Sequence, residues 1–183
     1  TVVLWALEGR IVQKIGHPAV VAVIACAPDG SVFASGSYDG QVRLFDAQGH
    51  LKQVIGSAGD YRVYALAFSP EGQRLLVGQT NNWIRLYDLQ GKKIFETQVF
   101  TENKTGGAAI HSVAFSPDGR SFCGGAEGGL AQVFRLVDDR PVPVFRLQHY
   151  PARSVLSVRF SADSQQVLTG SGDGWGRIWK LFN

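Results

Sequence analysis

Short apolar runs alternate with turn residues along the whole chain. Within residues 17–57, four runs rich in β-branched and aromatic residues cover residues 20–26, 32–34, 42–45 and 51–55, and turns containing Pro, Gly or Asp separate them. Runs of this length and composition, joined by such turns, predict a four-stranded antiparallel meander. No amphipathic helical pattern competes with this interpretation.

The same pattern recurs four times. A turn segment after the first run of each copy reads Cys26-Ala-Pro-Asp-Gly30, Phe68-Ser-Pro-Glu-Gly72, Phe115-Ser-Pro-Asp-Gly119 and Phe160-Ser-Ala-Asp-Ser164. A second marker, at the end of the third run, reads Phe45-Asp46, Tyr87-Asp88, Phe134-Arg135 and Trp179-Lys180. Self-similarity with a period of 42 to 47 residues indicates a modular array in which each copy is one structural unit.

The later copies repeat the expected strands. First strands are expected at 63–68, 110–115 and 155–160, third strands at 84–87, 130–134 and 176–179, and fourth strands at 92–97 and 142–147. A glycine precedes each third-strand aromatic by nine residues, at Gly36, Gly78, Gly125 and Gly170. A residue without Cβ lets another backbone or side chain approach closely, so this glycine is expected to serve packing.

These turn segments, together with the block Ser35-Gly-Ser-Tyr-Asp-Gly-Gln-Val-Arg-Leu-Phe-Asp46 and the block Ser171-Gly-Asp-Gly before Ile178-Trp179, resemble the WD-repeat family over nearly the whole chain. The resemblance implies an all-β fold, a β-propeller built of four-stranded antiparallel blades, with about four repeats present. Repeats 3 and 4 depart from the pattern at Gly128-Gly129 and at Ala162, Ser164 and Lys180, so their turns are expected to differ.

The phase of the repeat suggests a partial ring. Residues 1–16 fit the last two strands of a preceding blade, residues 17–58 repeat 1, residues 59–106 repeat 2 with its following loop, residues 107–148 repeat 3, and residues 149–183 repeat 4 without its outer strand. We therefore expect the C-terminal part of a larger propeller. The alternative is that two or more copies assemble to close one ring, because unpaired edges and exposed blade faces favour association.

Composition and charge narrow the function classes. With 45% hydrophobic and 18% charged residues the chain can form a substantial core, and its formal net charge of +3 is spread without a basic run, so nucleic acid is not the expected partner. No apolar stretch is long enough for a membrane helix, and we expect a soluble cytoplasmic protein. Cys26 and Cys123 occupy unrelated repeat positions, and neither a metal site nor a cofactor is expected.

Two repeats contain a hydroxyl, an imidazole and a carboxylate, which invites a catalytic interpretation. The residues are His17, Ser35 and Asp39 in repeat 1, and His149, Thr169 and Asp173 with Trp179 in repeat 4. A constellation that recurs with the repeat is more simply structural, because a catalytic site normally occurs once. The resemblance implies a buried hydrogen-bond network that fixes each blade, and no catalytic residue and no enzyme activity are expected.

The resemblance places partner contacts at the start of each first strand and just before the second-turn carboxylate. The positions of this kind and their neighbours that we expect to contact a partner are Tyr38, Tyr61, Arg62, Tyr64, Thr80, His111, Glu127 and Arg153. Tyr and Arg combine large contact area with hydrogen-bonding capacity, which suits a protein or peptide partner. The alternative is that the tyrosines only cover the blade tops. Recognition of phosphopeptide or nucleic acid through Arg62, Lys104 and Arg153 is a further alternative, with weaker support in the sequence.

Overall fold

The computed structural model describes residues 1–57, 59, 61–99 and 108–181, and within these residues every strand pairs antiparallel with its neighbours. The predicted all-β, propeller-type fold is confirmed. The elements are β1 (Val2–Trp5), β2 (Ile11–Ile15), β3 (Val21–Cys26), β4 (Val32–Ser37), β5 (Val42–Asp46), β6 (Leu51–Ile55), β7 (Val63–Phe68), β8 (Arg74–Gln79), β9 (Trp83–Asp88), β10 (Lys93–Gln98), β11 (Ile110–Phe115), β12 (Ser121–Ala126), a 3₁₀ turn η1 (Glu127–Gly129), β13 (Leu130–Val137), β14 (Arg140–Gln148), β15 (Val155–Phe160), β16 (Gln166–Ser171) and β17 (Gly176–Lys180).

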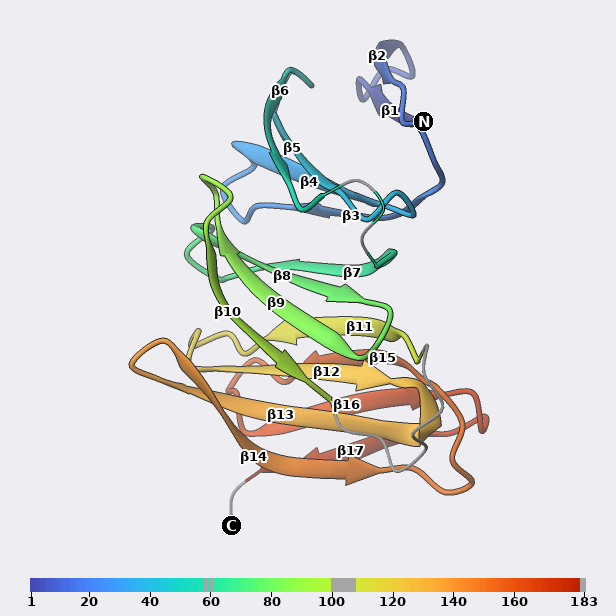
Figure 1. Cartoon of the computed structure of the whole chain (residues 1–183), viewed down its shortest axis with the longest axis vertical. Coiled ribbons are helices and arrows are strands. Elements are labelled where there is room, and N and C mark those ends of the chain that lie inside the picture. Colours follow the sequence, from blue (N-terminus) through green and yellow to red (C-terminus); the bar gives the residue numbers. More distant parts are fainter. Residues whose placement is uncertain (58, 60, 100–107, 182–183) are drawn as a thin grey trace.

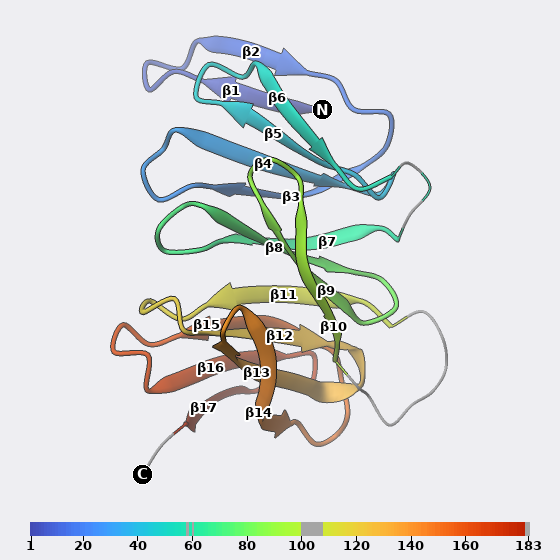
Figure 2. The same ribbon diagram turned by 60° about the vertical axis from the view of Figure 1, so that its left-hand side comes forward.

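The strands form sheets that follow the chain in order. The hairpin β1–β2 is followed by the four-stranded sheets β3–β6, β7–β10 and β11–β14 and by the three-stranded sheet β15–β17. The sheets lie face to face in this order, from the blue hairpin to the red sheet (Figure 1). The first strands of successive sheets, β3, β7, β11 and β15, neighbour one another on the inner side, whereas β10 and β14 lie at the outer edge (Figure 2). We call the last four sheets blades 1 to 4.

The core lies between the blades rather than within one of them. Blades 1 and 2 enclose a cluster that includes Leu44, Val63 and Leu75, and blades 2 and 3 enclose one that includes Ile84 and Phe122. A further cluster joins blades 3 and 4, and a smaller one joins the β1–β2 hairpin to blade 1. Because apolar burial is shared between neighbours, each blade depends on the next for its stability.

The recurring glycine lies at the contact between successive blades. A Cβ built on Gly78 in β8 would lie 2.7 Å from Cγ2 of Ile110, the first residue of β11 in the next blade. Gly36 and Gly125 meet the first residues of β7 and β15 in the same way. A Cβ on Gly170 in blade 4 would meet only Ser157 of its own blade, at 3.8 Å. The described chain therefore places no further blade against this side of blade 4.

Blades 3 and 4 differ from blades 1 and 2 in their turns, as their sequences suggest. In blade 4, Ser164 has a φ of 61° where the other three blades have a glycine in the same left-handed region. In blade 3, the turn between the second and third strands is the 3₁₀ segment η1. We expected β13 to end at 134 and β14 to begin at 142, which was wrong. Asp138 and Asp139 both have positive φ values and close a tight hairpin, and this turn lets the two strands pair as far as Val137 and Arg140.

No helix within the described residues is long and apolar enough to cross a membrane.

Candidate partner-binding face

The turns between second and third strands and the connections into the first strands come together on one side of each blade, which we call the loop face. One backbone hydrogen bond recurs there in every blade. The N–H groups of Tyr38, Thr80, Glu127 and Gly172 donate to the carbonyls of Val20, Arg62, Ala109 and Ser154, at 2.9 to 3.2 Å. In each blade this bond fixes the residue that precedes the second-turn carboxylate position. It holds that residue next to the start of the first strand of the same blade.

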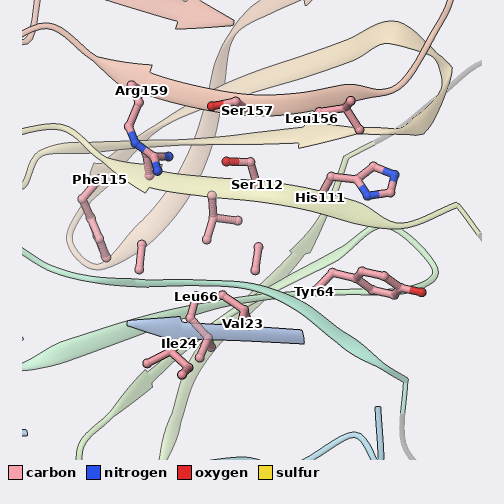
Figure 3. A pocket seen from close by; sticks show the side chains of 14 residues that line it. Val23, Ile24, Tyr64, Leu66, His111, Ser112, Phe115, Leu156, Ser157 and Arg159 are labelled. Atoms are coloured by element: carbon pink, nitrogen blue, oxygen red, sulfur yellow. The ribbon is translucent and has the colours of Figure 1, made fainter. Parts of the chain in front are cut away.

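A bulge interrupts the first strand of each blade. The register with the second strand shifts there, and the unpaired residues are Ala22, Tyr64, His111 and Leu156. An extra residue in one strand redirects a side chain that regular pairing would constrain. Tyr64 and His111 point to the same end of the concave inner surface (Figure 3). The repeat position of these residues is visible in the sequence, but the bulge is not.

Five of the expected contact residues form a continuous row on the loop face. The Arg62 guanidinium lies over the Tyr38 ring, with Cζ 5.1 Å from the ring centroid. The Tyr38 and Tyr64 centroids are 5.2 Å apart, and those of Tyr64 and His111 are 5.9 Å apart, with the two rings edge to face. His111 Nε2 lies 3.6 Å from Oε1 of Glu127. This loop-face row crosses blades 1, 2 and 3.

The other three expected residues lie outside this row. The backbone N–H of Thr80 donates to the carbonyl of Arg62. The carbonyl of Arg153 accepts a hydrogen bond from the Ser171 hydroxyl. The Tyr61 ring lies 6.0 Å from Cζ of Arg85. Part of the long connection before blade 3, residues 100–107 with Lys104, lies outside the described residues.

A second contact between an arginine and an aromatic ring, at Arg85 in β9, was not predicted from the sequence. The Arg85 guanidinium lies 5.5 Å from the Trp83 ring, donates to Glu96 at 3.1 Å and also bonds to Gln79. Arg85 has the same repeat position as Arg43 and Arg177, so alignment of the repeats could have identified it. Its charge is balanced by the carboxylate of Glu96.

The row borders a pocket on the concave inner surface. The pocket has a volume of 410 Å³, and its wall comes from the first strands of all four blades. Tyr64 and His111 lie at one end, Phe115 and Arg159 at the other (Figure 3). Most of the wall is apolar, and Tyr64, His111, Ser112, Ser157 and Arg159 add a few polar groups, the composition typical of a ligand-binding surface.

In repeat 4 the hydroxyl, imidazole and carboxylate lie together with an arginine that we had not expected. His149 Nε2 is 2.7 Å from Oγ1 of Thr169, which also accepts a hydrogen bond from Trp179 Nε1 at 2.8 Å. Arg177 donates to the carboxylate of Asp173 at 2.6 Å and to Nδ1 of His149. Nδ1 also lies 3.5 Å from Oδ2 of Asp173, but the guanidinium is the nearer group, so we assign the imidazole proton to Nε2, which donates it to Thr169.

Repeat 1 divides the corresponding groups into two separate pairs. His17 Nε2 lies 2.7 Å from Oγ of Ser35, while Asp39 receives two hydrogen bonds from the Arg43 guanidinium, at 2.8 and 3.3 Å. The expected link between imidazole and carboxylate is replaced by an arginine–carboxylate pair. A two-point bond of this kind positions the second turn without needing the histidine.

The ionisation of these groups follows from their surroundings. Burial, and next the Arg177 guanidinium, lower the pKa of His149 against an opposing effect of Asp173. Burial also lowers the pKa of His17. Burial by itself would raise the pKa of Asp39, but hydrogen bonds from Arg43 and Gln41 outweigh it and leave that pKa below its ordinary value. A folded chain with neutral histidines and ionised aspartates suits a structural network.

The arrangement in repeat 4 is unsuited to nucleophilic chemistry. Thr169 is 3% exposed, and its oxygen already accepts two hydrogen bonds, so no reacting carbonyl could reach it. Within the described residues, no group of three or more His, Cys, Asp or Glu side chains could hold a metal ion.

Comparison with known families agrees with this architecture. Residues 8–139 match the family described as Vps8 beta-propeller, and residues 141–180 match the family described as WD domain, G-beta repeat. The chain belongs to the WD-repeat β-propeller family. The segment that matches the WD domain, G-beta repeat includes blade 4 and its network residues.

Three relatives show how widely this WD-repeat sequence is shared. WD repeat-containing protein SL1-17 of Schistosoma mansoni is 32% identical over 77% of this chain and 46% of its own length. Telomerase protein component 1 of Mus musculus is 28% identical over 97% of this chain and 6% of its own length. Protein groucho of Drosophila melanogaster is 25% identical over 99% of this chain and 24% of its own length. The chain thus spans less than half of each of these relatives.

Proposed function

We propose that this WD-repeat chain is a non-enzymatic scaffold that binds a protein or peptide partner on its loop face. The observation that carries the proposal is the loop-face row, in which Arg62, Tyr38, Tyr64, His111 and Glu127 from three blades touch in sequence. Strands β7 and β11 carry Tyr64 and His111, and the recurring backbone hydrogen bond fixes the turns that carry Tyr38 and Glu127, so these side chains are in place before any partner arrives. Binding then costs little additional conformational entropy, which favours a recognition role. WD-repeat propellers generally serve as interaction scaffolds, which supports the same conclusion.

The cellular compartment is part of the same proposal. Cys26 is exposed, Cys123 is buried, and neither forms a disulfide. We infer a reducing, cytoplasmic environment, where unpaired cysteines persist.

The test compares two double variants of the chain in affinity capture followed by quantitative mass spectrometry. Arg62→Ala with Tyr64→Ala removes the centre of the loop-face row, and Gln90→Ala with Lys92→Ala changes exposed residues on the opposite face. Proteins that bind the row should be lost at least about tenfold with the first variant and kept with the second, because central Tyr and Arg contacts each contribute about 2 kcal/mol or more. Hydrogen exchange of the purified complex should show protection at β7 and β11. Equal capture by both variants would reject the loop face as the binding surface.

A second proposed role is association with further blades, from another copy or from the rest of a propeller. The observation that favours it is the open side of blade 4, where Leu168 pairs with Ile178 and the two side chains are 42% and 66% exposed. At the other interfaces this side of a blade is covered. Sedimentation velocity should show concentration-dependent association that Leu168→Asp with Ile178→Asp abolishes. A parent chain that stays monomeric, and does not bind separately produced blades, would contradict this role.

A further inference from the structure

The loop-face row carries opposite charges at its two ends. Arg62 is exposed, and its guanidinium contacts the Tyr38 ring without a carboxylate partner among the described residues. At the other end, the Glu127 carboxylate has only His111 beside it, at 3.6 Å, and within the described chain no Lys or Arg neutralises it. The row is therefore a strip with a cationic end, three rings and an anionic end.

The other carboxylates on the loop face of blades 1 and 4 are already paired. Arg43 holds Asp39 at 2.8 Å, and Arg177 holds Asp173 at 2.6 Å. Both of these aspartates are nearly or fully buried, whereas the Glu127 side chain is 44% exposed. Glu127 thus differs from them in offering an accessible negative charge, and the turn η1 holds it in place.

A polar atom to which no described residue bonds lies beside that charge. His111 Nε2 is buried, it has no hydrogen-bond partner among the described residues, and its distance of 3.6 Å from Oε1 of Glu127 is too long for a hydrogen bond. Nε2 is itself enclosed, and 3.6 Å leaves no room for another atom between it and Oε1 of Glu127, so a ligand reaches this end of the strip at the exposed carboxylate. An ammonium or guanidinium group that binds there would neutralise the carboxylate.

We propose that the partner supplies an extended peptide segment with two charged side chains of opposite sign. A carboxylate pairs with Arg62, and a Lys or Arg side chain places its charged end on the exposed Glu127 carboxylate beside His111, with its alkyl stem along the Tyr64 ring. This inference rests on the proposed function and adds the chemical class of the partner. Because the strip is cationic at Arg62 and anionic at Glu127, it favours peptides whose acidic residue lies at Arg62 and whose basic residue lies at Glu127.

The length of the strip sets the spacing of the two charges. Successive separations of 5.1, 5.2 and 5.9 Å lead from Arg62 through Tyr38 and Tyr64 to His111. An extended chain advances about 3.3 Å per residue, and the path along these contacts is the longest the strip can be, so the acidic and basic residues stand at most about five positions apart.

The experiment selects binders from a displayed library of random peptides of about eight residues, long enough to cover the strip. The chain should enrich peptides with one acidic and one basic residue at this spacing. Arg62→Gln should relax the acidic preference and Glu127→Gln the basic one, each weakening a selected peptide about two- to fivefold in fluorescence anisotropy. The exchange Arg62→Glu with Glu127→Arg should enrich the reverse order. Glu8→Gln with Arg10→Gln, an exposed pair on the β1–β2 turn, makes the same change of charge elsewhere and should alter nothing.

The outcomes separate this inference from the proposed function. Peptides that need Tyr64 but show no charge pattern would overturn the inference and keep the loop face as the binding surface. Peptides whose binding also survives Tyr64→Ala, or the absence of any enriched peptide, would overturn both. Far-ultraviolet circular dichroism and thermal melting of each variant exclude loss of fold as the cause.

Discussion

At the scale of single residues, the hydroxyl of Thr169 joins two donors. It accepts hydrogen bonds from His149 and Trp179 in a setting where water cannot replace it. Arg177 donates to the Asp173 carboxylate and to Nδ1 of His149, and it thereby links the aspartate to the histidine. Groups linked in this way specify one packing of the blade, because each is costly to leave unpaired.

We therefore predict that Thr169→Val lowers the free energy of unfolding by about 1–3 kcal/mol, because the isosteric valine leaves buried donors unpaired. Urea denaturation of the purified chain measures this change. Ser35→Ala in repeat 1 is the matched control and should cost less, since Ser35 bonds to one histidine and no indole. Asp173→Ala should be destabilising as well. A Thr169→Val chain as stable as the parent would contradict the structural interpretation of the network.

Some residue-scale features could not be predicted from the sequence. Ser164 takes the left-handed conformation that glycine takes in the other repeats, because the surrounding hairpin of blade 4 imposes the same turn. The sequence shows that Ser164 replaces the glycine of the other repeats. Its backbone conformation, however, depends on the strands on either side of the turn. The repeat pattern equally identified His149 and Thr169 but not Arg177, since arginine at this position also reads as an ordinary exposed strand residue.

At the scale of elements, the contact between the second strand of one blade and the first strand of the next controls packing. The glycine at this contact was predicted as a site of close approach, and its partner in the following blade became visible only in three dimensions. Ile110 fills the space over Gly78, and Val155 does the same over Gly125.

We predict that Gly78→Ala destabilises the chain by about 1–3 kcal/mol, because the added methyl group would lie 2.7 Å from Cγ2 of Ile110. Gly170→Ala is the matched control. It adds the same methyl group at the same repeat position without a blade against it, so stability should be kept or rise by up to about 1 kcal/mol. Thermal denaturation compares the two variants. Equal losses would show that strand geometry, rather than contact between blades, requires this glycine.

The strands themselves were largely predictable, and the side-chain row was predictable only in part. Alternating apolar runs and Pro-Asp-Gly turns define the blades because they are local signals. The contact of Tyr38 with Tyr64, and of Tyr64 with His111, depends on how neighbouring blades are placed and on the bulges in β7 and β11. Family resemblance named these positions, but it could not show that His111 Nε2 lacks a hydrogen-bond partner among the residues that the structure describes.

At the scale of the whole molecule, stability should depend on pH through two histidines in different blades. Burial lowers the pKa of both His17 and His149 below the ordinary value of 6.5, so the folded chain holds them neutral. As the pH falls below about 6.5 the unfolded chain binds more protons than the folded chain, and the free energy of unfolding decreases. Above that pH the contribution is fully present. The carboxylates with lowered pKa, such as Asp39, act in the same direction only below about pH 4.

The free energy of unfolding should therefore fall in two separate stages on acidification. Urea titrations between about pH 7.5 and about pH 3 would resolve them, since the histidine and carboxylate ranges lie well apart. His17→Gln should reduce the first stage and leave the second, because glutamine keeps a polar group near Ser35 and does not titrate. A stability curve that is level between about pH 7.5 and about pH 5 would mean that the histidines are not held neutral, and the tautomer assigned to His149 in the blade 4 network would then be wrong.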